Sequence, residues 1–258
     1  MFEARFPNAI LLKRILDAIK DLVQDVNWLC TEDGIELQSM DAAHVALVSF
    51  TILPDACTVY RCTELHRLGM NVNNLAKIVK CAENDDSVLL RLSKDTSKLE
   101  IQFESKNGSR RHDFQMALMD IDSEHLNIPD VEYTCSVKMP SAEFSRLTRD
   151  MASFGEITTL SVQEGSLKAT TLGDGGQSSI VIKQDKTSKA TKLWTEIDCS
   201  ETTEMMFALK YLVAFTKAQN IADQVSLFFL KGSPLYVSYD MEDKGSVGFY
   251  LAPRQDED

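Results

Sequence analysis

Basic side chains recur on one side of several segments that the sequence predicts as helices. The clearest case is FALKYLVAFTKAQN, residues 207–220, which contains Lys210 and Lys217 and no acidic residue. Cations spread over several exposed helix faces suit the many phosphates of a nucleic acid better than one small ligand. These residues therefore predict a phosphate-binding surface.

The overall composition makes such a surface unusual. The 258 residues include 39 Asp and Glu against 27 Lys and Arg, which gives a formal net charge of −12. This excess favours solubility and repels nucleic acid from most of the surface. An ordinary exposed helix face mixes both signs, because pairs one turn apart are stabilising. The sorting of cations onto helices therefore indicates a local basic patch with a function.

Four helices position these cations. Apolar periodicity predicts them at roughly 9–23, 73–81, 141–153 and 209–219, two in each half of the chain. In the first, Leu11, Ile15, Ile19 and Leu22 form the predicted apolar stripe. On helical wheels the cations lie away from the apolar stripes; they are Lys13, Arg14, Lys20, Lys77, Lys80, Arg146, Arg149, Lys210 and Lys217. No aromatic residues are interleaved with them, which favours a duplex backbone over stacked single-stranded bases.

Most of the remaining sequence predicts short strands. Several segments alternate apolar and polar residues, as strands with one buried face do. VNWLC, TEDG and IELQSMD together predict a hairpin with Asp-Gly at its turn. The fold class expected is therefore α+β.

The two halves of the chain resemble each other when they are aligned at one constant offset of 133 in the numbering. Lys77 matches Lys210 at this offset, whereas Lys217 matches Asn84. A shared offset that persists along most of one half indicates an internal duplication. It predicts two similar sheet-and-helix domains, joined by an acidic, extended connector; the three segments are 1–117, 118–134 and 135–258.

Little in the sequence suggests catalysis, a metal site or a cofactor. The four histidines lack ligand spacing, no GxSxG motif occurs, and GDGGQ at 173–177 lacks the Gly-Lys-Ser/Thr of a phosphate-binding loop. Asp120 and Asp122 suit Mg²⁺ in principle, but a solvated acidic connector is the better interpretation. We therefore expect a binding protein rather than an enzyme, with no cofactor.

The sequence also lacks the marks of a membrane or secreted protein. It has no run of about 18 apolar residues, and charges interrupt the apolar stretch at the N-terminus, so we expect neither a transmembrane helix nor a signal peptide. The six cysteines form no CxxC pair, and most lie in apolar runs. We expect free thiols rather than disulfides.

Several stretches along the chain resemble a known family. They are MFEARF at the start, LQSMDAAHVALV at 37–48, YRC at 60–62, LAKIVKCA at 75–82, LMDID at 118–122, KMPSAEF at 138–144 and LAPR at 251–254. Together they closely resemble the eukaryotic sliding clamp family, proliferating cell nuclear antigen, over essentially the whole chain.

The resemblance implies a nuclear ring of three identical subunits that encircles double-stranded DNA without reading its sequence. Such a ring acts as a processivity factor for the replicative polymerase. Its helices line the hole, which implies the following DNA-facing residues: Lys13, Arg14, Lys20, Lys77, Lys80, Arg110, Arg149, Lys210 and Lys217.

The resemblance also implies a docking pocket under the connector for short peptide motifs of partners. Its residues here are Met40, His44, Val45, Leu47, Leu126, Ile128, Pro234, Tyr250, Ala252 and Pro253. These are mainly apolar and suit a short helix with aromatic anchors. The partners implied are the DNA polymerase, the clamp loader, a flap endonuclease and DNA ligase.

The subunit contact is implied to join the strand at 110–117 of one copy to the strand around 178–183 of the next. The residues expected there are Cys81, Phe114, Met116, Met151, Phe154, Ile180 and Ile182. For any single one of them, ordinary core packing is the alternative.

One departure from the family concerns a lysine that carries ubiquitin. This chain has Glu164 at that position, and the nearest lysine is Lys168. Glutamate cannot carry ubiquitin in this way, so attachment at position 164 is in doubt, or it has moved to Lys168.

The sequence is also compatible with two other functions. One is a subunit of a heterotrimeric checkpoint clamp, although the well-matched pocket and LAPR tail favour the replicative homotrimer. The other is a metal-dependent nucleic-acid enzyme that uses Asp120 and Asp122.

Overall fold

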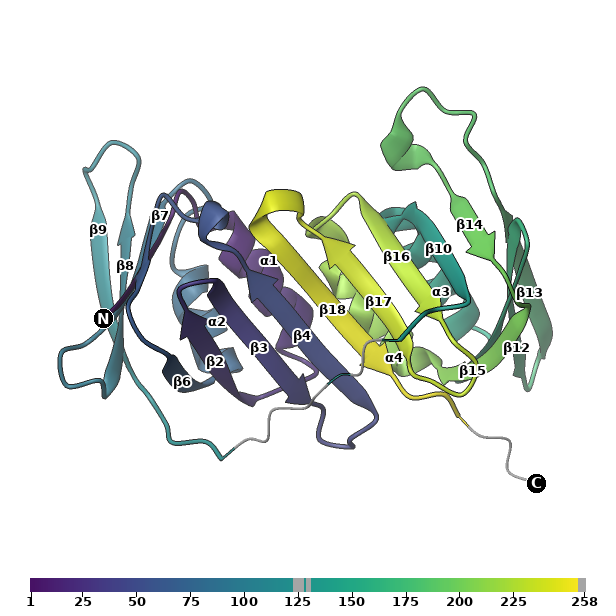
Figure 1. The fold of residues 1–258 in the computed structure, drawn as a ribbon, viewed down its shortest axis with the longest axis horizontal. Helices are drawn as coiled ribbons and strands as arrows, with labels where there is room; N and C mark the ends of the chain where they lie inside the picture. The colour runs from purple at the N-terminus through teal and green to yellow at the C-terminus, as the bar shows by residue number, and fades with distance from the viewer. Residues whose placement is uncertain (123–127, 129–130, 255–258) are drawn as a thin grey trace. The chain divides into compact units, whose positions relative to one another are not determined.

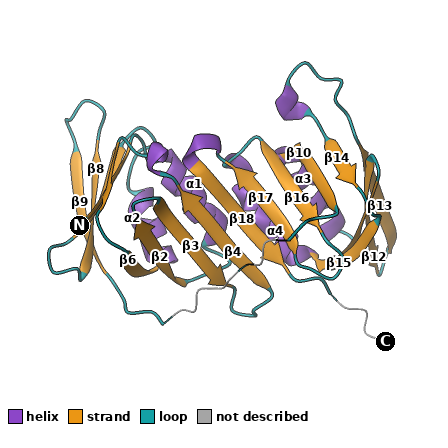
Figure 2. Cartoon of the chain, viewed as in Figure 1, coloured by secondary structure: helices purple, strands orange, loops and turns teal. Residues whose placement is uncertain are grey.

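The computed structural model describes residues 1–122, 128 and 131–254. Within them the chain forms strands β1–β18 and helices α1–α4, together with short 3₁₀ turns η1–η4 (Figures 1 and 2). They gather in two compact units. Unit 1 is Met1–Ala42, Val48–Leu126 and Met241–Val247, and unit 2 is Ala43–Leu47, Asn127–Asp240 and Gly248–Asp258. Antiparallel sheets with few helices confirm the predicted α+β class.

Unit 1 contains two groups of hydrogen-bonded strands. The first has the order β5-β1-β7-β8-β9 and the second the order β4-β3-β2-β6. The strand bounds are β1 (Phe2–Phe6), β2 (Asp25–Thr31), β3 (Gly34–Met40), β4 (Ala46–Ile52), β5 (Val59–Cys62), β6 (His66–Asn71), β7 (Ser87–Leu92), β8 (Lys98–Glu104) and β9 (Arg111–Ala117). A turn η1 (Pro54–Ala56) lies between β4 and β5.

The predicted hairpin is confirmed as β2 and β3. Thr31 pairs with Gly34, so Glu32 and Asp33 form a two-residue turn. Gly34 has a φ of +141°, and a Cβ at this position would lie 2.3 Å from the carbonyl oxygen of Ile52. Only glycine allows this backbone and this close approach.

Helices α1 (Ile10–Ile19) and α2 (Val72–Lys80) pack against each other in unit 1. The side chain of Asn71 accepts a hydrogen bond of 3.1 Å from the backbone N–H of Asn74 and so caps α2. The apolar stripe of α1 differs in part from the prediction, because Leu12, Ile15, Leu16 and Ile19 are buried whereas Leu11 and Leu22 are only half-buried. The helix begins at Ile10, and positions 12, 15, 16 and 19 form one face from there.

Unit 2 repeats the arrangement of unit 1, with strand orders β14-β10-β16-β17-β18 and β13-β12-β11-β15. Phe215 and Phe249 stack in its core with ring centroids 4.6 Å apart. The bounds are β10 (Cys135–Pro140), α3 (Ser141–Ala152), β11 (Ile157–Gln163), β12 (Ser166–Gly173), β13 (Gly176–Lys183), η2 (Thr191–Leu193), β14 (Glu196–Cys199), β15 (Thr203–Ala208), α4 (Leu209–Phe215), η3 (Thr216–Asn220), β16 (Gln224–Phe229), β17 (Leu235–Asp240), η4 (Glu242–Lys244) and β18 (Gly245–Leu251).

The matching strand orders confirm the duplication, but the constant offset is wrong for the middle elements. β1 and β10 begin at Phe2 and Cys135 and keep the predicted offset. α2 and α4 begin at Val72 and Leu209, which lie further apart in the chain. The register changes because the connection between β13 and β14 is longer than its counterpart between β4 and β5; the two segments are 184–195 and 53–58.

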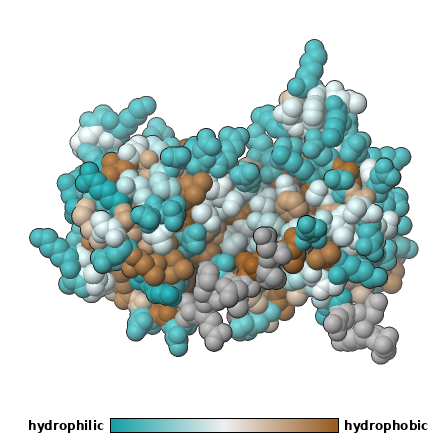
Figure 3. Space-filling model, viewed as in Figure 1, coloured by the Kyte–Doolittle hydropathy of each residue, from teal (hydrophilic) through white to brown (hydrophobic). Residues whose placement is uncertain are grey.

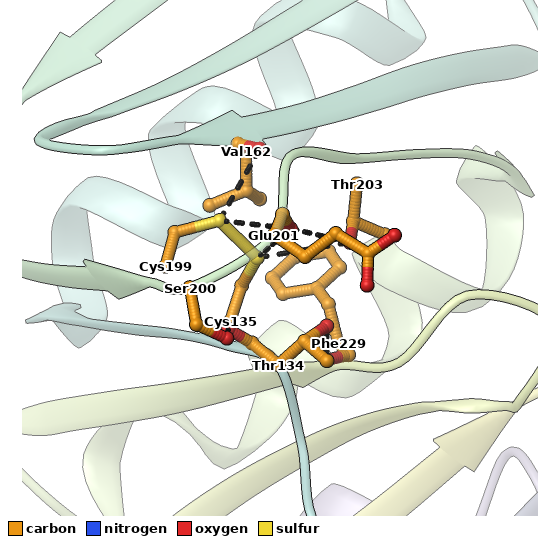
Figure 4. Close-up of a disulfide and its surroundings, with 8 residues drawn as sticks. All are labelled: Thr134, Cys135, Val162, Cys199, Ser200, Glu201, Thr203 and Phe229. Atoms are coloured by element: carbon orange, nitrogen blue, oxygen red, sulfur yellow. Dashed lines mark hydrogen bonds between the residues drawn. A yellow bond between two sulfur atoms is a disulfide. The ribbon is translucent and has the colours of Figure 1, made fainter.

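The structure also corrects the expectation for two cysteines. Cys135 and Cys199 are joined by a disulfide between β10 and β14 (Figure 4). They lie opposite each other in the antiparallel register, with Cα atoms 4.0 Å apart, although 64 residues separate them in sequence. Sheet register, which sequence spacing does not reveal, decides this pairing. The free thiols are Cys30, Cys57, Cys62 and Cys81.

Two absences hold for the part of the chain that the structure describes. No helix there is long and apolar enough to cross a membrane. No three His, Cys, Asp or Glu side chains come together there in a way that could hold a metal ion. The carboxylates of Asp120 and Asp122 are exposed.

Candidate nucleic-acid interface and docking surfaces

The cationic side of unit 1 is built by α1 and α2. Arg14, Lys77 and Lys80 are exposed, whereas Lys13 and Lys20 are half-buried. The exposed residues alternate with the buried stripes, so the same periodicity that packs each helix turns its cations outward. The wheels predicted this arrangement for Lys77 and Lys80 of α2. In α1 they turned Lys13 and Lys20 outward, whereas both are half-buried and Arg14 is the exposed cation.

Two of these lysines already have protein partners. The Nζ of Lys13 donates to the carbonyl oxygen of Ala82 at 2.7 Å and to Oδ1 of Asn84 at 3.1 Å. Lys20 forms an ion pair and hydrogen bond with Asp17, and this hydrogen bond raises the pKa of the Lys20 ammonium. Lys20 therefore keeps its charge, but an acid one turn away offsets it.

The cationic side of unit 2 is built by α3, α4 and η3. Arg149 is exposed and its Nε donates to the carbonyl oxygen of Ser145 at 3.2 Å. Lys210 is exposed, with its Nζ 4.8 Å from the ring centroid of Tyr211, and Lys217 is exposed on η3. Arg146 is also exposed on α3, with Nε 3.9 Å from the carboxylate of Asp150.

The structure changes which lysines are counterparts. When α2 and α4 are aligned from their first residues, Val72 and Leu209, Lys80 and Lys217 fall at the same position. In this alignment Lys210 matches Asn73 rather than Lys77. The basic counterpart that the sequence comparison did not find for Lys217 is therefore Lys80.

Arg110 differs from the other predicted DNA-facing residues because it lies on no helix. It follows the turn between β8 and β9, where Nη1 donates to Glu83 at 2.8 Å and Nη2 to Asp86 at 3.0 Å. The side chain of Asp86 is only 5% exposed. The hydrogen bond to Glu83 and the charge of Asp86 raise the pKa of Arg110. Its guanidinium thus neutralises a buried carboxylate and fastens the turn.

Most of the predicted docking residues belong to unit 2. The backbone N–H of Ala252 donates to the carbonyl oxygen of Val45 at 3.0 Å, so the LAPR segment runs beside residues 43–47. His44, Pro234 and Ala252 are exposed, Val45, Tyr250, Pro253 and Ile128 are half-buried, and Leu47 is buried. Met40 ends β3 in unit 1, and Leu126 lies outside the described residues.

An aromatic cluster beside Tyr250 was missed by the sequence reasoning. The Tyr250 ring stacks on Tyr236 at 4.4 Å, and Tyr236 stacks on Phe228 at 5.6 Å. Tyr133 packs against Phe228 at 5.4 Å. All four rings are half-buried, and burial raises the pKa of Tyr250 and Tyr133. Alternation in QVSLFF and LYVSYD was the available signal, because it puts Phe228 and Tyr236 on the side of the sheet away from the core.

This aromatic cluster lies on the sheet face opposite the helices. In Figure 1 strands β16–β18 lie in front of α4, and Figure 3 shows apolar residues between polar ones on the same side. Phe228 belongs to β16, Tyr236 to β17 and Tyr250 to β18. A flat, half-exposed aromatic surface of this kind suits an aromatic or aliphatic side chain of a partner peptide.

The residues predicted for subunit contact lie around two edge strands. β9 pairs only with β8, and β13 only with β12, among the described strands. Edge strands present unpaired N–H and C=O groups that a second chain can extend. On β13 and nearby, Phe154 and Val181 are each 52% exposed and Leu172 is 77% exposed. Exposed apolar side chains beside an open edge indicate an interface.

The predicted contact residues divide into exposed and buried groups. Cys81 is exposed, and Phe114 and Ile180 are half-buried. Met116, Met151 and Ile182 are buried within their own units, and Met151 accepts a hydrogen bond from Thr171. Ordinary packing accounts for these three, whereas Leu172 and Val181 are exposed residues that the sequence reasoning did not name.

Comparison with known families agrees with this architecture. Residues 1–125 match the family described as proliferating cell nuclear antigen, N-terminal domain. Residues 127–254 match proliferating cell nuclear antigen, C-terminal domain. Together the two matches cover nearly the whole chain, one for each copy of the repeated topology. The chain therefore belongs to the proliferating cell nuclear antigen family of DNA sliding clamps.

Proposed function

We propose that three copies of this chain form a closed ring around duplex DNA and hold a replicative polymerase on its template. The observation that carries the proposal is the placement of exposed cations on the helices of both units, in an otherwise acidic chain. Duplicated cationic faces suit a uniform, sequence-independent phosphate lattice.

The two open sheet edges support the closed ring. β9 belongs to unit 1 and β13 to unit 2, so pairing β9 of one copy with β13 of the next is a head-to-tail contact. Such contacts generate rings when the rotation closes. A homotrimer then offers six copies of the cationic face.

Sliding follows from the chemistry of the contacts. A closed ring retains DNA by topology, so tight binding is unnecessary. Lysine makes exchangeable phosphate contacts as a mobile point charge, and no base-reading element lies among the cations of the described helices. The acidic remainder of the surface discourages DNA from binding elsewhere.

Partner proteins dock on a different surface, the one formed around Tyr250 and the LAPR segment. The half-buried aromatic residues beside Tyr250 and the LAPR segment suit short helical motifs with aromatic anchors. Partners of this kind are the polymerase, clamp loader, flap endonuclease and DNA ligase. A docked enzyme is held near the primer end at raised effective concentration, so the chain acts as a scaffold rather than a catalyst. We place this activity in the nucleus.

The solution mass tests the ring directly. We expect about three times 28.9 kDa by light scattering at micromolar concentration. A clamp loaded onto a nicked circular plasmid is expected to stay bound in high salt and to be released when the plasmid is made linear. A strict monomer, or release that does not depend on linear ends, would contradict the ring.

A further inference from the structure

A lysine-bearing loop in unit 2 has no role in the proposed function. The η2 loop, residues 184–195, joins β13 to β14 and contains Lys186, Lys189 and Lys192. Its only acidic residue is Asp185. The equivalent connection in unit 1, residues 53–58, contains no lysine or arginine. The connection in unit 2 is therefore longer than its counterpart in unit 1 and is basic, whereas the connection in unit 1 carries no cation.

The η2 loop is closed and held by its own hydrogen bonds. Asp185 and Thr195 exchange backbone hydrogen bonds of 2.9 Å at its base. The indole N–H of Trp194 donates to the carbonyl oxygen of Ser188 at 2.7 Å. A compact loop with close ends and internal packing presents its side chains in a fixed arrangement. In Figure 1 it projects beyond the ends of the neighbouring strands of unit 2.

The carboxylate of Asp185 is occupied within the loop. Its Oδ1 accepts hydrogen bonds from the backbone N–H and the hydroxyl of Thr187, at 2.8 and 2.7 Å. These hydrogen bonds lower the pKa of Asp185. Among the described residues, Asp185 forms no ion pair with a lysine of the loop. The loop therefore keeps three lysines against one carboxylate, which is hydrogen-bonded to Thr187.

The pairs that the lysines make are weak and exchangeable. Lys186 lies 3.3 Å from Glu196, and Lys192 lies 3.3 Å from Asp223. Both pairs are exposed, and exposed ion pairs contribute little because solvent screens them. Lys189 is exposed and has no ion-pair partner among the described residues. A phosphate can therefore replace the acidic partners at small cost.

The loop adjoins the cationic helices of its own unit. The side-chain amide of Gln224 donates to the carbonyl oxygens of Thr191 and Trp194, at 3.3 and 3.2 Å. The backbone carbonyl of its neighbour Asp223 accepts a hydrogen bond from the backbone N–H of Ser141, the first residue of α3. Residues 221–224 directly follow η3, which carries Lys217. One short segment thus joins the loop, the start of α3 and the turn after α4.

We propose that the η2 loop is a second phosphate-binding element. Lys186, Lys189 and Lys192 contact the backbone of a duplex that runs along the cationic side of α3 and α4. The inference rests on the proposed function, because it requires a duplex on the helix side. A nucleic acid is favoured over an acidic protein segment because residues 221–224 link the loop to α3 and η3, which carry exposed cations of the same unit.

The test is the salt dependence of binding to a fluorescent 40-base-pair duplex. Each phosphate contact contributes about 0.9 to the slope of log K against log salt. The K186Q/K189Q/K192Q variant is expected to lower this slope by about 2–3 and to weaken binding roughly 10-fold at low salt. The K94Q/K168Q/K231Q variant removes the same charge from exposed positions elsewhere and is expected to lower the slope by less than about 0.5.

A second variant tests the opposite direction. The E196Q/D223N variant releases Lys186 and Lys192 from their acidic partners. It is expected to tighten duplex binding about 2- to 5-fold at low salt, with the trimer mass unchanged. Because it removes no loop lysine, this result separates phosphate contact from a general loss of folding.

The outcomes separate the loop from the ring. If the K186Q/K189Q/K192Q variant has the same salt slope as the K94Q/K168Q/K231Q control, this inference is overturned. The proposed function still stands in that case if the K80E/K217E variant lowers the salt slope. If neither K186Q/K189Q/K192Q nor K80E/K217E changes the salt slope, the proposed function is overturned as well. A loop variant that keeps duplex binding but loses binding to a polyglutamate peptide assigns the loop to an acidic protein and also overturns the inference.

Discussion

Lys80 and Lys217 occupy the same place in the two copies of the fold. Lys80 is the last residue of α2, and Lys217 lies in η3, which continues directly from α4. Each is equally far from the start of the helical segment, which is Val72 for α2 and Leu209 for α4. Both side chains are exposed. Two copies of one topology thus present an exposed lysine at the same point, and the proposed function predicts that both contact the DNA backbone.

Reversal of both charges tests this relationship. The K80E/K217E variant is expected to reduce polymerase stimulation more than about 10-fold, because two attractive phosphate contacts per subunit become repulsive. Primer-extension length on a long template measures this. K94E/K231E makes the same charge change at two exposed turns and should retain stimulation. If the K80E/K217E variant supports the same primer-extension length as the wild type, the helices do not form the DNA interface.

The open edge of β13 predicts how to make a monomer. Val181→Asp places a charge on an exposed apolar residue of this edge. It is expected to shift the solution mass from a trimer towards 28.9 kDa, because a desolvated carboxylate without a partner is costly in an interface. Leu65→Asp is the matched control, since Leu65 is 57% exposed in another part of the chain. A trimeric Val181→Asp variant would exclude this edge from the contact.

Cysteine reactivity gives an independent measurement of the same contact. Burial raises the pKa of Cys57 to about 12 and also raises that of Cys30 and Cys62. A raised pKa lowers the thiolate fraction at pH 8, so these thiols react slowly with maleimide. Exposed Cys81 should react first in the Val181→Asp variant and much more slowly in wild type. Equal rates in the two proteins would place Cys81 outside the interface.

The stack of Tyr250 on Tyr236 predicts the effect of truncating the docking surface. Tyr250→Ala is expected to weaken binding of an aromatic-anchored partner peptide about 10- to 100-fold, because central aromatic residues dominate such interfaces. Tyr250→Phe retains the ring and should bind within a few-fold of wild type. Fluorescence anisotropy with a labelled peptide measures both. If the Tyr250→Ala variant binds the peptide as tightly as the wild type, Tyr250 is not part of the docking pocket.

The Cys135–Cys199 disulfide predicts a dependence of stability on reducing agent. It joins cysteines with a sequence separation of 64, so its removal is expected to lower the free energy of unfolding by roughly 2–4 kcal/mol. Urea denaturation of C135A/C199A, without reductant, measures this, and reduced wild type should fall towards the same value. Thiol titration of unreduced, unfolded protein is expected to find four thiols. Six would contradict the bridge.

Local patterns were enough to predict the hairpin, the approximate positions of the four helices and most of their exposed cations, although the fourth helix ends at Phe215 and continues as η3. Helical periodicity and strand alternation are set by neighbouring residues, so Lys77, Lys210 and Arg149 could be assigned to exposed faces from sequence alone. The duplication was visible for the same reason, because both copies keep similar residues in similar order. The LAPR segment and the N-terminal stretch carried the family resemblance that the domain matches confirm.

What the tertiary structure decided concerns partners that lie far apart in the chain. The ion pairs of Arg110 with Glu83 and Asp86, the Cys135–Cys199 bridge and the stack of Tyr236 on Tyr250 join different strands or turns. Sheet register fixes these contacts, and register depends on every strand in the sheet rather than on local spacing. For the same reason the equivalence of Lys80 and Lys217 emerged only when α2 and α4 were matched as elements. The sequence by itself determined which helix residues are cations and predicted that they lie away from the core; the fold determined that Lys13 and Lys20 are half-buried and bonded to Ala82 and Asp17, because those partners are set by how the helices pack and end.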